Sequence, residues 1–191
     1  MSADPNATTV RRVRPAGPAA ILVPLLVGAA VAVLLGVYAK THDPRFFSVN
    51  VAGFSSPTAV KTWLATLTFA LAICQLCTAA ALYGRIRPLA NAGWTGPAHV
   101  WSGRLAVLVS VPVAVHCLYA LGFQDSTTRV LLHSLFGCFL YGAFVAKMLL
   151  LTRKGLPNWV IPVAGGLLFS GLTVVWLTSA LWFFRTSGLT F

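Results

Sequence analysis

The chain has 191 residues, of which 58% are hydrophobic and 9% are charged, and its mean hydropathy is +0.82. A soluble domain does not have this composition, so the sequence predicts an integral membrane protein. No soluble domain remains to bind nucleic acid, although the formal net charge is +11. Glutamate is absent and the only aspartates are Asp4, Asp43 and Asp125, outside the apolar runs, which excludes paired-carboxylate hydrolysis and disfavours ion-coupled transport.

Five apolar runs follow one another along the chain, and each approaches or exceeds the ~20 residues that a spanning helix needs. A polar tail over residues 1–17 precedes them, and a short tail over 186–191 follows. The linker at 84–97 is rich in Gly and Pro, and we expect no helix in it. The sequence therefore predicts an all-α antiparallel bundle of five transmembrane helices, over about 18–39, 59–83, 98–122, 130–151 and 159–184.

The loops differ in charge. Seven basic residues fall in the tail and in the loops after the second and fourth runs, against four on the other side, so the positive-inside rule predicts a cytoplasmic N-terminus and an outer C-terminus. We expect a multi-pass protein of a bacterial plasma membrane, in contact with membrane lipid.

Two histidines occupy consecutive runs. His116 lies near the end of the third run and His133 near the start of the fourth, which puts them about 9 Å and about 7–8 Å deep on antiparallel helices. Level imidazoles on separate helices suit the axial positions of a b-type haem, with both as iron ligands. Gly137 would leave room for a macrocycle, and Arg129 would meet a propionate. The alternatives are polar packing residues, or a zinc or copper site, which needs a third ligand.

The other histidines have different settings. His99 opens the third run on the cytoplasmic side, about 25 Å from His116, and only Met148 is a plausible partner there for a second haem. The sequence favours His99 and Arg104 as contacts to a quinone head or a lipid, or His99 as a polar helix start. His42 is predicted to be a solvated loop residue.

Two short motifs resemble known membrane haem proteins. The stretch from His99 through Gly103 and Arg104 to Ala106 resembles the H-x-x-x-G-R-L-A segment of ferric-reductase-like domains. The stretch from His133 to Gly137, continuing to Lys147, resembles the H-x-x-x-G helices of cytochrome b561 proteins. Those families carry two b haems on four histidines. The resemblance implies that His116 and His133 form the outer ligand pair, while only His99 matches the inner pair.

These patterns predict a membrane cytochrome b with one bis-histidine haem. It would carry electrons between the quinone pool and an extracytoplasmic redox partner. The alternative is a cofactor-free structural or assembly subunit of a larger membrane complex.

Overall fold

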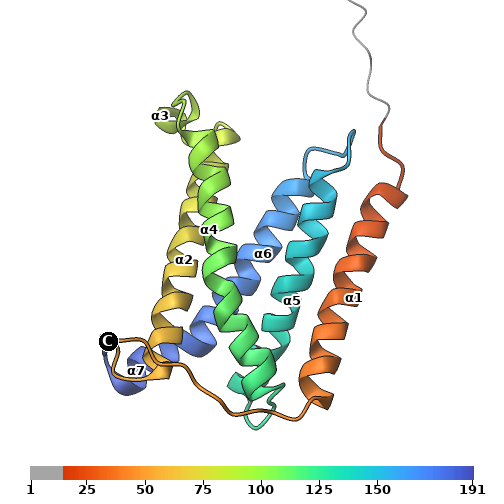
Figure 1. Ribbon diagram of the computed structural model, residues 1–191. Helices are drawn as coiled ribbons and strands as arrows, with labels where there is room; N and C mark the ends of the chain where they lie inside the picture. Colours follow the sequence, from red (N-terminus) through yellow and green to blue (C-terminus); the bar gives the residue numbers. More distant parts are fainter. Residues whose placement is uncertain (1–14) are drawn as a thin grey trace, which may run out of the picture.

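A computed structural model of the chain describes residues 15–191; most of the predicted polar tail therefore lies outside the described residues. The described part is helical, without strands, and five of its helices are long and apolar enough to cross a membrane (Figure 1). The predicted fold class is thus confirmed. The spanning helices are α1 (Ala19–Thr41), α2 (Pro57–Leu82), α4 (Thr95–Val115) with the π-helical η1 (His116–Leu121), α5 (Thr128–Leu151), and α6 (Val160–Trp176) with η2 (Leu177–Leu181) and α7 (Trp182–Ser187).

Hydroxyl caps set two of the helix starts. Ser56 precedes Pro57, and its side chain accepts from the backbone N–H of Ala59; Thr127 does the same for Val130. Both helices therefore begin two residues before the predicted starts. The cap satisfies a backbone N–H of the first turn, and a prediction from hydropathy alone does not take such caps into account. The linker prediction was wrong in part, since the short helix α3 (Arg87–Ala90) forms there, with proline in its first turn.

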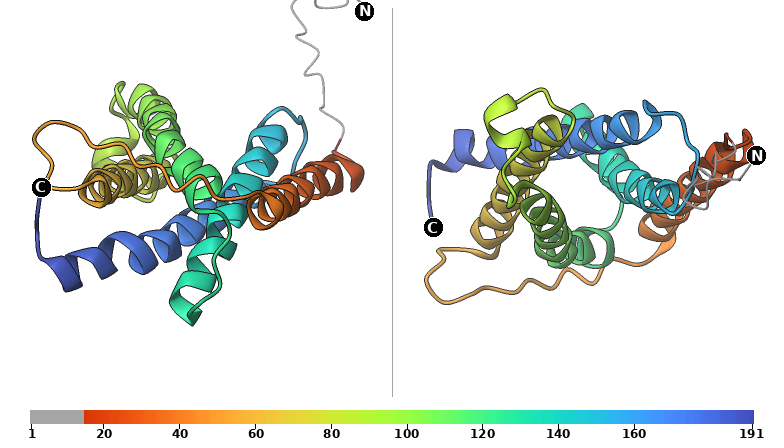
Figure 2. Two further views of the ribbon diagram at one scale, coloured as in Figure 1. Left: turned by 60° about the horizontal axis from the view of Figure 1, so that its bottom comes forward. Right: turned by 90° about the horizontal axis from the view of Figure 1, so that it is seen from above.

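The helices associate in pairs. α1 packs along α5, α2 along α4, and α6 along α5, whereas few contacts join α4 to α5. Figure 2 shows α2 beside α4, and α1 beside α5. α4 and α5 do meet where Tyr141 Oη donates to Ser110 Oγ at 2.9 Å. The helices that carry His116 and His133 are consecutive and antiparallel, as predicted, but each packs chiefly against another partner.

Small residues hold α1 against α5. A Cβ on Gly142 would overlap the carbonyl oxygen of Gly28 and lie 2.8 Å from the Cβ of Ala32. A Cβ on Gly28 would lie 2.7 Å from the Cβ of Ala146. The two backbones therefore approach closely only because these positions lack side chains, as is common where membrane helices pack.

Candidate functional site

The candidate site lies at the end of the bundle that carries the α4–α5 loop, at the bottom of Figure 1. His116 is the first residue of η1, five residues before its end, and His133 is five residues into α5. Both are thus about 8 Å along their helices from this loop. Two further residues belong to the site: Lys61 in the second turn of α2, and Thr178 in η2. The π-helical turns η1 and η2 are a feature that is frequent at functional sites.

His133 is oriented by Thr178. The Thr178 hydroxyl donates its only proton to the carbonyl of Val174 at 2.7 Å, so its oxygen must accept from His133 Nδ1–H, at 3.3 Å. His133 is therefore the tautomer that is protonated on Nδ1, with a lone pair on Nε2. Within residues 15–191, Nε2 has no hydrogen-bond partner.

Two neighbours of His133 on α5 differ in their surroundings: Arg129 is held by other side chains and backbone, whereas Gly137 borders open space. Arg129 Nη1 donates to the backbone carbonyl of Thr178 at 2.7 Å, and its guanidinium lies 4.0 Å from the ring centroid of Trp182. The cation is therefore anchored beside His133 by η2 and α7. Gly137, one turn further along α5, has open space where a Cβ would stand. Room for a macrocycle beside His133 stays a prediction, with which this open position is compatible.

His116 has a different partner, which the sequence analysis did not single out. Nζ of Lys61 lies 2.9 Å from His116 Nε2, and an ammonium can only donate, so Nε2 accepts and Nδ1 holds the proton. The imidazole is buried, with 9% of its surface exposed, and it meets the ring of Phe47 edge-on at 5.7 Å. The sequence contains no intramembrane carboxylate, so the charge of Lys61 faces a neutral base instead of a counter-ion.

These two imidazoles have the donor atoms that iron requires. Haem ligation uses an unprotonated imidazole nitrogen, with the other ring N–H held by a nearby acceptor. Thr178 supplies that acceptor to His133. His116 is in the same tautomer, but its Nε2 lone pair is directed at Lys61, so ligation there requires the lysine to leave. Residues 15–191 hold no cluster of three His, Cys or acidic residues of the kind that the zinc or copper alternative would use.

At the opposite end of the bundle, α2 and α4 surround His99. Thr78 Oγ1 donates to Cys74 O at 2.7 Å and accepts from His99 Nδ1 at 2.9 Å, which again leaves Nε2 unprotonated. The Gln75 amide donates to the His99 carbonyl and, at 2.8 Å, to Ser102 Oγ. Thr78 of α2 therefore orients the ring of His99, and Gln75 ties α2 to the backbone of α4 beside it.

The residues predicted to accompany His99 lie elsewhere. Arg104 is exposed and lies over the ring of its helix neighbour Trp101, at 5.2 Å. Met148 is also exposed, on α5. The space beside Gly103 is filled by Gln75, whose side chain would lie 3.1–3.2 Å from a Cβ there.

A model described as a family of unknown function, DUF6529, matches residues 21–191. The chain belongs to the DUF6529 family. No curated protein and no solved structure matches it. The family match covers the five spanning helices of this DUF6529 protein, apart from the first two residues of α1, and it includes every residue of the candidate site.

Two features of this DUF6529 chain escaped the sequence analysis. Lys61 lies in an otherwise apolar run and was not singled out. It could have been recognised as a cation four residues after the start of a spanning helix, in a chain that has no intramembrane acid to pair with it. The prediction that His42 is a solvated loop residue was correct about the loop, since His42 follows the last residue of α1, but wrong about the degree of solvation. Its ring is half-buried and stacks between Tyr38 and Tyr119, while Nε2 bonds the Tyr119 carbonyl at 2.7 Å.

Proposed function

We propose that this protein is a small membrane cytochrome b, in which His133 and His116 hold one b-type haem near the α4–α5 loop. The observation that supports the proposal is that both imidazoles, at the same end of the bundle, are tautomers with a basic Nε2. When bound, the haem would supply one-electron redox chemistry. With both histidines bound to the iron, reaction with O₂ there would not be expected.

The side chains around the pair have distinct roles in this proposal. Thr178 holds the ring of His133 by its Nδ1–H, and Gly137 leaves the adjacent helix surface open. Arg129 and Lys61 are cations at the same end of the bundle. Neither has an intramembrane carboxylate as a counter-ion, because the sequence contains none. Acidic groups of a cofactor would therefore find compensating charge here.

Electron exchange is proposed to involve the quinone pool and a redox partner outside the membrane. His99 Nε2, at the other end of the bundle, can accept a hydrogen bond from a quinol hydroxyl, since Thr78 fixes the proton on Nδ1. Arg104, which is exposed on α4 and lies over Trp101, remains a proposed second contact to the quinone head or to lipid. The cytoplasmic N-terminus and the plasma membrane location belong to the same proposal.

The contact between Lys61 and His116 favours the second candidate function, a cofactor-free subunit that packs within or assembles a larger membrane complex. A lysine that donates to His116 Nε2 satisfies a buried polar pair without any ligand. In that case the histidines are structural, and the exposed apolar face of α1, which includes Leu26 and Leu34, is available for another subunit.

A difference spectrum separates the two functions. The full chain is purified from haem-sufficient cells, and absorbance is recorded in the reduced minus the oxidised state. We expect a sharp α band of b type that is lost in His133→Ala and in His116→Ala, and retained in the control His42→Ala. Absence of the band in the unaltered protein would favour the cofactor-free subunit. A band that persists in both ligand variants would overturn the ligand assignment.

A further inference from the structure

A groove on the outer surface of the bundle lies between α1 and α5, away from the histidines. Its volume is about 470 Å³, and it is open along one side. Val33 and Val37 of α1 form one wall, and Leu135 and Phe139 of α5 form the other. These four side chains are exposed, so no part of residues 15–191 covers the groove.

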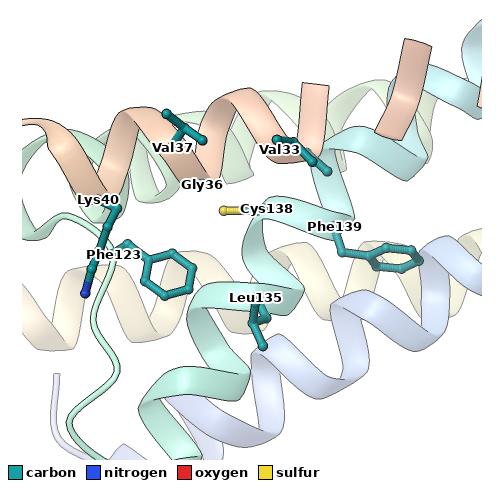
Figure 3. A pocket seen from close by; sticks show the side chains of 9 residues that line it. Val33, Gly36, Val37, Lys40, Phe123, Leu135, Cys138 and Phe139 are labelled. Carbon is teal, nitrogen blue, oxygen red and sulfur yellow. The ribbon is translucent and has the colours of Figure 1, made fainter. Parts of the chain in front are cut away.

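The groove exists because α1 and α5 diverge from their close contact at Gly28 and Gly142. Further along, a Cβ on Gly36 would still lie 3.8 Å from Cys138 Sγ, in ordinary contact. The side chains of the two walls diverge on either side of the contact between Gly36 and Cys138. Figure 3 shows Lys40 and Phe123 together at one end of the groove and Val33 and Phe139 toward the other.

The length of the groove corresponds to one leaflet. It extends along α1 from Ala32 to Lys40, which is about 12 Å at helical rise. This length is similar to the thickness of one leaflet, which is half of a ~30 Å hydrocarbon core. A partner helix would instead need a surface that spans the whole core. The size and apolar lining suit a single hydrocarbon chain that enters from the leaflet on the side of the α4–α5 loop.

An ion pair marks the mouth of the groove. Lys40 Nζ lies 2.8 Å from Asp125 Oδ2, and both side chains are more than half exposed. Lys40 Nζ is also 5.9 Å from the ring centroid of Phe123, which lines the groove. A positive and a negative group therefore stand side by side at the level where a phospholipid places its headgroup.

We propose that this groove binds one acyl chain of a zwitterionic aminophospholipid, with the lipid phosphate at Lys40 and its ammonium at Asp125. Each charge of the headgroup would meet a residue of opposite charge, the anionic phosphate at Lys40 and the cationic ammonium at Asp125. An anionic phospholipid without an ammonium would satisfy Lys40 but place its phosphate beside the Asp125 carboxylate. The site therefore selects the zwitterionic headgroup, and it does not depend on the proposed haem.

Native mass spectrometry of the detergent-purified full chain tests the proposal. Phosphatidylethanolamine or phosphatidylglycerol with identical acyl chains is added, and the retained lipid is counted. We expect one retained phosphatidylethanolamine, preferred about 1.5- to 5-fold over phosphatidylglycerol, the range of exposed ion pairs. Gly36→Leu, which fills the groove, should lose this lipid, while Gly166→Leu, on an open face of α6, should retain it.

A second variant keeps the test decisive if Gly36→Leu fails to fold. The double variant Lys40→Gln with Asp125→Asn alters only exposed side chains, and it should bind both lipids equally while still retaining one. Equal binding by the unaltered protein would overturn the headgroup assignment. Unchanged lipid retention in folded Gly36→Leu would overturn the groove as the site, as would a dimer that this substitution abolishes.

Discussion

The hydrogen bond between Thr178 and His133 provides a sharp test of the site geometry. Thr178→Val keeps the shape of the side chain but removes the oxygen that accepts from His133 Nδ1–H. The contact of Arg129 is retained, because it uses the backbone carbonyl of residue 178. The substitution therefore removes the side-chain acceptor of one imidazole N–H in the membrane interior and leaves only the backbone carbonyl of Val175 as a nearby alternative.

The expected loss follows from the length of the bond. Hydrogen bonds between membrane helices contribute about 0.6 kcal/mol on average and at most about 1.7 kcal/mol. The N···O distance of 3.3 Å is slightly beyond the usual range, so we expect a value in the lower part. A loss of about 0.5–1 kcal/mol corresponds to a two- to fivefold change in the folding equilibrium.

Reversible unfolding of the full chain in mixed micelles measures this change. Thr173→Val is the matched control, since the Thr173 hydroxyl donates to the Phe169 carbonyl at 2.8 Å but meets no imidazole. A double-mutant cycle of Thr178→Val with His133→Leu isolates the pair. If the two threonine variants lose equal stability, or if the coupling in the cycle is zero, then Thr178 does not orient His133. In a haem-loaded protein, the same substitution should weaken haem retention roughly 10- to 100-fold.

Three further predictions concern other parts of the molecule. Gly142→Ala should destabilise the bundle by about 1–3 kcal/mol relative to Gly166→Ala, because its Cβ would meet the backbone of α1 whereas the control position is open; equal stabilities in micelle unfolding would contradict the close contact. Nitrogen NMR of histidine-labelled protein without haem should find His99 and His133 protonated on Nδ1, and an Nε2–H tautomer at either would refute the threonine contacts. The hydrogen bond and charge of Lys40 lower the pKa of the Asp125 carboxyl, so the stability that the ion pair contributes is present above the ordinary pKa of aspartate and is lost as pH falls through the lowered value. Carboxyl-carbon NMR should show this pKa rise in Lys40→Gln; an unchanged titration would mean that the pair does not persist in solution.

The sequence by itself determined the class, the five spans and their order. An apolar run of sufficient length must be helical in a bilayer, since lipid offers no partner for backbone N–H and C=O groups, and hydropathy detects such runs directly. The sequence also placed His116 and His133 near one end of the bundle, because both follow from their distance to the α4–α5 loop. To predict the starts of α2 and α5, which directly follow the capping residues Ser56 and Thr127, capping must be considered in addition to hydropathy.

The tertiary structure decided which helices pack together and which side chains meet. The sequence could not specify the partners because spanning helices are apolar on all sides, and lipid tails are as apolar as leucine, so periodicity does not mark an inner face. Close approach at Gly28 and Gly142 brings α1 to α5, and polar contacts from Gln75 and Thr78 bring α2 to α4. That arrangement places Lys61 against His116 and Thr178 against His133, contacts that depend on helix rotation and on partner choice.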